Sequence, residues 1–543
     1  METIFKDKNG EPIYVLGLQS HNSSNGAWEL IDKSIQAVKL YHGNTLEVPV
    51  YWFQVEPEEG KFDLSVVEGL IKRVRDNGLY LVILWFGFSK NAGNTYLPEW
   101  AKEDAERFWS AVGPDGCAVP IVSPNCDAVY EADKKAFMAL MQCIKNFDEK
   151  ERTVIAVQVE NELGLYNIDR CYSKKAQAEF DKGVPKELEG ITLEDSGAKR
   201  NDNSWYGKFG RHAHEAFSAW HFGCGVEKIA AAGKSIYPNM PLFANTMIGE
   251  IRMEVAGHSY SSGSPVGRVL DIWKAAAPSL SLIAPDIYQR FRSGYHRICR
   301  TYKRKNNPLF ITETGTMGDG FASHIIHAAV DYAALGICGF GAESTLDADM
   351  KLHPEAKKVA ASMDIIKSMS PVLLKYGGTD KLFCLSQEEF QAHEYIKREK
   401  YHIQFNFSSE TPSQRPPGFP RSFGTNLPVT NLGAKDPDYY VQRGRAIVFE
   451  KDPYDFYLAG IGVAARFLLR TEVGDKFPVI INQSRSATEV AALTIEEGHF
   501  TKDCEWVCDF KRRGDELNPG ALLYPGMVLR VKLNPNACRP VAV

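Results

Sequence analysis

The chain has 543 residues, of which 44% are hydrophobic and 24% are charged. These proportions are typical of a globular protein, and the length predicts more than one domain. The formal net charge is only −5, which argues against a nucleic-acid or membrane surface as the main partner.

The cysteines and the N-terminal residues predict a cytoplasmic location. The chain has 11 cysteines, an odd number, and Cys143, Cys224 and Cys338 lie within apolar runs, which is typical of reduced, buried thiols. The opening residues, METIFKDKNGEPIYVLG, show no basic segment followed by an apolar one. No apolar run reaches the roughly 18 residues that span a bilayer. We therefore expect a cytoplasmic protein without a membrane segment.

Short apolar runs alternate with helical patterns over the first two thirds of the chain. The apolar runs predict eight strands: Ile13–Gln19, Thr45–Tyr51, Leu79–Phe88, Val154–Glu160, Pro241–Thr246, Leu280–Ala284, Leu309–Thr312 and Ile337–Phe340. Each is followed by a predicted helix: Trp28–Tyr41, Leu64–Asn77, Glu131–Phe147, 205–236, Val266–Ala277, Tyr295–Asn306, Ser323–Leu335 and Glu355–Tyr376. This alternation predicts a (β/α)8 barrel with a long insertion over residues 89–130.

An open, doubly wound sheet is the alternative to a closed barrel. Such a sheet usually has a phosphate-binding glycine motif after its first strand, but here the strand continues into LQSHNSS. The chain also has no HExxH motif, and Cys504 and Cys508 form a single C-x3-C pair without a second pair. We therefore predict neither a cofactor nor a metal ion.

The pattern changes after residue 377 to short alternating runs separated by Gly, Pro and Asn. The runs are Tyr401–Phe407, Ala446–Phe449, Phe456–Ile461 and Met527–Val531. They predict a β-sandwich-like domain over residues 377–543, after a catalytic barrel over residues 1–376. The join LLKYGGTDKLFCL has no flexible linker, so we expect the two domains to pack together. The Pro-rich stretch at 411–428 is predicted to be a loop.

Two glutamates follow strands on opposite sides of the predicted barrel. The fourth strand ends in Glu160-Asn161-Glu162, and Glu313 follows the seventh. The active site of such a barrel lies at the carboxyl ends of the strands, so Glu162 and Glu313 could converge on one bound group. Retaining glycoside hydrolysis uses such a pair, with one carboxylate as nucleophile and the other as acid/base.

Several segments resemble glycoside hydrolase family 35 β-galactosidases. VQVENELG resembles the acid/base motif, in which Asn-Glu ends the fourth strand, and ITETG resembles the nucleophile strand. VYWFQVEPEEGKFDL and YLVILWFGFSKNAGNTYLPEW resemble the second- and third-strand signatures. GSPVGRVLDIW, LIAPDIY and DFYLAGIGVAARF resemble a bacterial and fungal subgroup with a β-rich C-terminal domain. The resemblance therefore spans nearly the whole chain.

The resemblance implies roles for individual residues. Glu162 would be the acid/base and Glu313 the nucleophile, while Asn161 would bind the sugar 2-hydroxyl and Tyr288 would keep the nucleophile ionised. Candidate substrate contacts at the other strand ends are Asn91, Trp52, Trp85, His21, Asn22 and Glu343. The alternative role of the two tryptophans is packing in the core. The alternative role of Glu343 is to form a salt bridge. The family has Glu after Asn-Ala, whereas this chain has Gly93, so the sugar is not fixed.

The sequence thus predicts a cytoplasmic, exo-acting, retaining β-glycosidase of the β-galactosidase type that acts on imported oligosaccharides. One alternative is a transglycosidase with the same carboxylates, because no residue pattern decides between water and a sugar as acceptor. Another is a non-catalytic sugar-binding barrel, which the presence of both carboxylates disfavours. The predicted partner is an oligosaccharide or glycoside, not nucleic acid or membrane, and a homo-oligomer is compatible with the sequence.

Overall fold

A computed structural model describes most of the chain. The described residues are 3–198, 202–250, 255–388, 391, 393–407, 443–470, 490, 492–517, 521–523 and 526–538. None of the helices within these ranges is long and apolar enough to cross a membrane. The predicted Pro-rich loop at 411–428 lies outside the described residues.

Eight parallel strands form the predicted barrel, in the order β10-β1-β2-β3-β6-β7-β8-β9. Their bounds are β1 Val15–Gln19, β2 Thr45–Tyr51, β3 Tyr80–Lys90, β6 Val154–Asn161, β7 Leu242–Thr246, β8 Leu282–Ile287, β9 Glu313–Thr314 and β10 Gly336–Phe340. A parallel bridge between Ile311, just before β9, and Ile337 of β10 closes the sheet. The predicted (β/α)8 barrel is confirmed.

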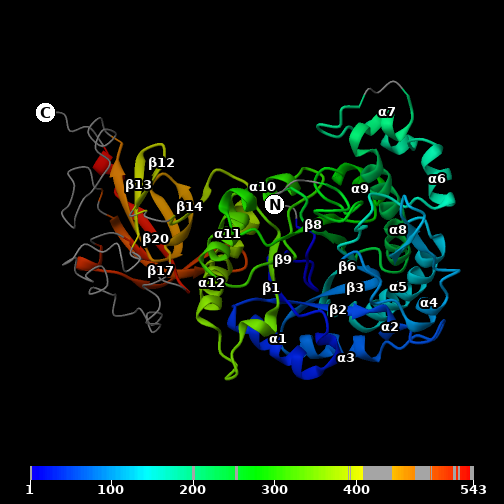
Figure 1. Ribbon diagram of the computed structural model, residues 1–543. Helices are drawn as coiled ribbons and strands as arrows, with labels where there is room; N and C mark the ends of the chain where they lie inside the picture. Colours follow the sequence, from blue (N-terminus) through cyan, green and yellow to red (C-terminus); the bar gives the residue numbers. More distant parts are fainter. Residues whose placement is uncertain are drawn as a thin grey trace.

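Helices cover the outside of the barrel (Figure 1). The long ones are α1 Trp28–Leu40, α3 Ser65–Asp76, α5 Asp127–Asp148, α8 Ala213–Ile236, α10 Arg292–Tyr302, α11 Asp319–Val330 and α12 Pro354–Tyr376, and α9 (Leu270–Ala276) is shorter. Every residue of β1, β2, β6, β7 and β8 is buried. Because both faces of these strands are covered, their sequences are nearly continuous apolar runs, and this made them predictable.

The predicted helix over 205–236 is broken in the structure. It consists of α7 (Trp205–Phe209), a 3-10 turn over Gly210–His212, and α8. Gly210 has a φ of 51°, and a Cβ atom there would lie 2.1 Å from the carbonyl oxygen of Ser196. The chain therefore leaves the helix at a glycine that helical periodicity alone does not reveal.

The segments around the barrel mouth also differ from the prediction. Regular pairing of the seventh strand begins at Glu313, after the expected run Leu309–Thr312. The insertion at 89–130 contains secondary structure that was not predicted: the end of β3, helix α4 (Glu99–Glu103) and a hairpin of β4 (Ser110–Val112) and β5 (Ala118–Val122). Two further helices, α2 (Trp52–Val55) and α6 (Lys174–Asp181), follow β2 and β6.

In the C-terminal part, the residues that the structure describes form two antiparallel sheets. Their strands are β11 Leu382–Ser386, β12 His393–Lys397, β13 Tyr401–Phe407, β14 Arg445–Asp452, β15 Asp455–Ile461, β16 Val463–Leu469, β17 Ala492–Phe500, β18 Trp506–Lys511, β19 Ala521–Leu523 and β20 Val528–Leu533. The orders are β11-β14-β15-β20-β17-β18 and β12-β13-β16-β19. Side chains of both sheets share a buried apolar core, as in a sandwich. The predicted all-β region after the barrel is confirmed.

The sheets pack on the side of the barrel that α11 and α12 cover (Figure 1). The connection is short, since α12 ends at Tyr376 and β11 begins at Leu382. Met369 and Leu373 of α12 belong to the same buried cluster as Phe449 of β14. The core of the barrel is therefore continuous with one face of the six-stranded sheet.

A buried arginine adds polar contacts to this interface. Arg445, the first residue of β14, is fully buried. Its guanidinium donates to the carbonyl oxygen of Lys358 at 2.6 Å and to the hydroxyl of Ser362 at 2.5 Å, both in α12. A buried charge needs such partners, so separating the two parts would leave polar groups without them.

We expect that ending the chain after Gly378 destabilises the barrel. The truncation exposes the apolar side of α12, at about 1.5–3 kcal/mol for each fully buried side chain, against a net stability of about 5–15 kcal/mol for a typical domain. Scanning calorimetry should show one cooperative transition for the full chain and a strongly lowered melting temperature for the truncated one. Two independent transitions, with an unchanged barrel, would contradict this.

Candidate active site

Hydrogen bonds to two neighbouring strand ends hold the backbone at Glu162. Its φ is 45°, in the left-handed region that residues other than glycine rarely adopt. In the loop after β3, the N–H groups of Asn91 and Ala92 donate to the carbonyl oxygens of Asn161 and Glu162, both at 3.1 Å. The N–H of Glu162 donates to the side-chain oxygen of Asn245, in β7, at 3.0 Å. The barrel thus fixes the direction in which the Glu162 side chain leaves β6.

A pair of buried carboxyl groups lies behind this strand end. Burial, with the neighbouring Asp133 carboxyl, raises the pKa of Glu160 well above its usual range, so the two groups share a proton. Glu160 accepts from the N–H of Ser89, and Asp133 from that of Phe88, both at 2.9 Å. A Cβ atom at Gly87 would lie 2.2 Å from Asp133 Oδ2 and 2.3 Å from Glu160 Oε1. The pair therefore ties the end of β3 to β6, two residues before Glu162.

Two donors hold the carboxylate of Glu313, which is 6% exposed. The Tyr288 hydroxyl donates to Oε2 at 2.6 Å and the Gln19 side-chain amide to Oε1 at 3.0 Å. Two such bonds stabilise a negative charge. Burial and the Glu313 charge raise the pKa of the Tyr288 phenol well above its usual range, so it remains a donor. The hydrogen bond predicted from Tyr288 to Glu313 is present.

The surroundings of Glu162 disfavour a negative charge on its carboxyl group. Burial raises the pKa of Glu162 to about 7, and the Glu313 charge contributes to the increase, whereas Lys90 opposes it. Burial, followed by the charges of Glu313 and Glu162, raises the pKa of Asp286 well above its usual range. Burial thus favours the protonated form of Asp286, and in that form its carboxyl group can donate a hydrogen bond to the neighbouring Glu162. The amide of Asn245 donates to Asp286 Oδ2 at 2.8 Å.

A cavity of about 290 Å³ opens beside Glu162, and Met247, Tyr260, Asp286 and Tyr288 are among its lining residues. Several buried polar atoms near the strand ends have no protein partner within the described ranges: Gln19 Oε1, Asn22 Oδ1, Ser89 Oγ and Asn161 Nδ2. Buried polar groups normally have partners. These atoms are therefore suited to a ligand with many hydroxyl groups.

A neighbouring lysine orients the side-chain amide of Asn161. The ammonium of Lys90 donates to Asn161 Oδ1 at 2.8 Å and to Asn91 Oδ1 at 2.9 Å. The first contact fixes the orientation of the Asn161 amide and leaves its NH2 group to a ligand. Asn91 itself is exposed, and its side chain contacts Lys90, consistent with a position at the rim of the site.

The substrate role predicted for Trp52 and Trp85 is wrong in this structure. Both side chains are fully buried, and their indole N–H groups donate to Glu56 at 2.8 Å and to Asp133 at 2.7 Å. Successive residues of a barrel strand face inward and outward alternately, and Trp85 faces outward, against Phe137 of α5. Neither ring has a free face on which a sugar could stack.

Glu343, His21 and Asn22 shape the loop after β1. The buried carboxylate of Glu343 accepts the His21 N–H at 3.1 Å and the Ser24 hydroxyl. The His21 ring is 2.6 Å from the Ser344 hydroxyl. The contacts of Glu343 hold this loop to the turn after β10, and its contact with substrate stays a prediction. His21 and Asn22 stay candidates for contact with substrate.

Sequence reasoning assigned no role to Gln19, Lys90, Asn245 or Asp286. Each is a polar residue at or near the carboxyl end of a buried strand. That position was a usable signal, because a polar side chain inside an apolar run needs a partner or a function. Their partners come from other strands, which spacing along the chain does not reveal.

Comparison with known proteins points to β-galactosidases. Residues 21–209 match a family model described as Beta-galactosidase, that of glycoside hydrolase family 42, and residues 359–523 match a domain of unknown function. A β-galactosidase of Xanthomonas manihotis is 29% identical over 158 residues, which is 28% of this chain and 25% of that protein. The matches agree with the predicted β-galactosidase-like glycoside hydrolase, but they do not confirm the assignment to family 35.

Two solved structures share the barrel. The β-galactosidase of Bacillus circulans sp. alkalophilus has a TM-score of 0.50 at 14% identity, covering 69% of this chain and 58% of that chain. A catalytic mutant of a family 42 β-galactosidase from G. stearothermophilus has a TM-score of 0.50 at 13% identity, covering 67% and 59%. This chain thus matches less than two thirds of each structure, and at such identities the likeness shows the fold.

We expect Glu162 to titrate near pH 7 in the free protein, because burial and the neighbouring Glu313 charge both disfavour its ionised form. Changing Glu313→Gln removes that charge while keeping an acceptor for Tyr288, so the pKa of Glu162 should fall. Carboxyl-carbon NMR of glutamate-labelled protein measures it, with Glu355→Gln in the first turn of α12 as a control that leaves it unchanged. Titration of Glu162 near its ordinary value of 4.5 in the unaltered protein would contradict the description.

Proposed function

We propose that the protein is a retaining exo-β-glycosidase of the β-galactosidase type, with Glu313 as nucleophile and Glu162 as acid/base. The observation that carries the proposal is the unequal pair of carboxyl groups. One has a pKa raised to about 7, and the other accepts hydrogen bonds from Tyr288 and Gln19. Retaining glycosidases need one proton-bearing and one ionised carboxyl group on either side of the scissile bond.

In the first step, Glu313 attacks the anomeric carbon while Glu162 donates its proton to the glycosidic oxygen. The bond from the anomeric carbon to that oxygen breaks, a bond to Glu313 forms, and the leaving group departs as an alcohol. The attack consumes the charge on Glu313, which had contributed to the raised pKa of Glu162. The pKa of Glu162 therefore falls once the glycosyl-enzyme has formed.

This fall suits the second step. Glu162, now ionised, accepts a proton from water as the water attacks the anomeric carbon and displaces Glu313. Two inversions leave the configuration of the sugar unchanged. The coupling between the two carboxyl groups thus favours an acid in the first step and a base in the second.

Asn161 and Asp286 support the pair in different ways. The Asn161 NH2 group, oriented by Lys90, is suited to bind the sugar 2-hydroxyl. Asp286 touches Glu162 and is itself held by Asn245, so it positions the acid/base. Tyr288, whose side chain is 46% exposed, combines a donor to Glu313 with a ring surface open to substrate.

The substrate is proposed to be a short oligosaccharide with a terminal, non-reducing β-linked sugar. Both the family 35 motifs and the family 42 match concern β-galactosidases, so galactose is the first choice whichever family applies. Because Gly93 replaces the glutamate of the family 35 motif, the preferred sugar can differ from galactose. Ten cysteines, from Cys117 to Cys508, are unpaired, and this supports the cytoplasm as the location.

We expect Glu162→Ala and Glu313→Ala to respond differently to azide with an activated aryl β-galactoside. Without Glu162 the first step is little affected, because the leaving group needs no proton, while the second step slows by about 10²–10⁴-fold. Azide needs no base, so it should restore turnover and yield a β-azide. Glu313→Ala should lose turnover and yield, if anything, an α-azide.

The control is Glu355→Ala, on the surface of α12, which should keep full activity. Rescue with the two product configurations exchanged would show that the roles are reversed. Normal turnover by Glu313→Ala would exclude the proposed mechanism. Aryl β-glucosides, fucosides and arabinosides, compared with the galactoside, decide the preferred sugar.

A further inference from the structure

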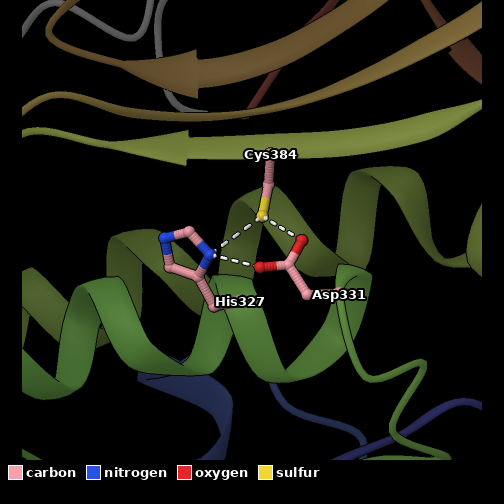
Figure 2. A group of neighbouring side chains, drawn as sticks. All are labelled: His327, Asp331 and Cys384. Atoms are coloured by element: carbon pink, nitrogen blue, oxygen red, sulfur yellow. Dashed lines mark hydrogen bonds and ion pairs between the residues drawn. The ribbon is translucent and has the colours of Figure 1, made fainter. Parts of the chain in front are cut away.

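A second group of chemically reactive side chains lies where the C-terminal sheets meet the barrel. His327 lies in the last turn of α11, Asp331 directly follows that helix, and Cys384 lies in β11 (Figure 2). His327 Nδ1 is 2.7 Å from Asp331 Oδ2 and 3.3 Å from Cys384 Sγ, and Sγ is 3.4 Å from Asp331 Oδ1. The proposed glycosidase mechanism uses none of these residues.

The arrangement is not that of a proton relay. In a Cys-His-Asp relay the thiol and the carboxylate contact different nitrogens of the imidazole. Here both contact Nδ1, so three potential ligand atoms surround a single point. Figure 2 shows the imidazole, the carboxylate and the thiol directed toward one another from a helix and a strand.

The spacing suits a tetrahedral zinc ion. Zinc bonds of about 2.0–2.1 Å to nitrogen and oxygen and about 2.3 Å to sulfur place tetrahedral ligand atoms roughly 3.3–3.6 Å apart. The two sulfur distances, 3.3 and 3.4 Å, are already close to these values. Only the contact between His327 and Asp331 must widen, and the Asp331 side chain, 41% exposed, has room to move.

A further contact orients the imidazole. His327 Nε2 is 2.9 Å from the hydroxyl of Ser386, in β11. In the tautomer with the proton on Nε2, this N–H donates to Ser386, and the lone pair on Nδ1 faces Asp331 and Cys384. Histidines that bind metal ions are usually oriented through their other nitrogen in this way.

The charges also favour a soft divalent cation. A thiolate and a carboxylate each carry one negative charge and the imidazole is neutral, so the set balances a divalent ion. Sulfur and imidazole ligands select zinc over magnesium or calcium. A cysteine thiol must lose its proton to bind a metal ion, so zinc binding by Cys384 releases one proton.

We propose that His327, Asp331 and Cys384 bind one Zn2+ that fastens β11 to α11. On binding, the S–H bond of Cys384 breaks and its proton leaves to solvent, while sulfur, Nδ1 and one carboxylate oxygen bind the metal. Water takes the fourth position, on the side where Asp331 is exposed. The ion thereby joins the barrel to the first strand of the C-terminal sheets.

The test is metal retention by the full-length protein. The protein is treated with a chelator, Zn2+ is added and unbound metal is removed. Inductively coupled plasma mass spectrometry should then find one zinc ion per chain. Cys384→Ser and the milder Asp331→Asn should each weaken binding by at least about tenfold. Cys508→Ser, which removes an exposed thiol in β18, should bind zinc normally and serves as the matched control.

Two further readouts separate the site from adventitious binding. Co2+ in place of zinc should give a thiolate charge-transfer band that Cys384→Ser abolishes and Cys508→Ser keeps. Zinc should raise the melting temperature of the unaltered protein, but not of Cys384→Ser, because a ligand that binds only the folded state stabilises it. No retained zinc, or equal retention by Cys384→Ser, would overturn the proposal. Glycosidase activity is not a readout, so failure here leaves the proposed function untouched.

Discussion

Electrostatic coupling between Glu162 and Glu313 is the interaction on which the site depends. Two neighbouring carboxyl groups with little access to water cannot both ionise easily. The surroundings of each group therefore determine which of the two keeps a proton. Hydrogen bonds from Tyr288 and Gln19 favour the charge on Glu313. Burial and that charge hold the proton on Glu162. In the proposed mechanism, their unequal surroundings, more than the mere presence of two glutamates, give each a separate role.

The barrel supports this coupling with further carboxyl groups whose ionisation burial disfavours. Glu47 lies close enough to Glu313 to be affected by its charge. Burial raises the pKa of Glu47 well above its usual range, and the Thr312 hydroxyl donates to its carboxyl group at 3.0 Å. Asp286 and the pair formed by Glu160 and Asp133 are buried in the same way. The carboxyl ends of these strands thus meet at the same end of the barrel. There, hydrogen bonds from the neighbouring strand ends hold the left-handed backbone conformation of Glu162.

The sequence was informative wherever a residue's role depends on its own strand. Buried parallel strands are continuous apolar runs, so the barrel and the position of Glu162 and Glu313 could be predicted. Contacts between distant strands could not: Gln19 and Glu313 are 294 residues apart, and Asn245 and Asp286 are 41 apart. Trp85 was misassigned because its direction depends on the alternation of side chains along β3, and a shift of one residue reverses it.

The most direct test of the central claim is to trap the covalent intermediate. An activated 2-deoxy-2-fluoro-β-galactoside should form the glycosyl-enzyme and release it slowly, because fluorine destabilises the positively charged transition states of both steps. Intact-protein mass spectrometry should show one added sugar per chain, and peptide mapping should place it on Glu313. An unlabelled protein that still hydrolyses the parent galactoside, or a label on Glu162, would contradict the account.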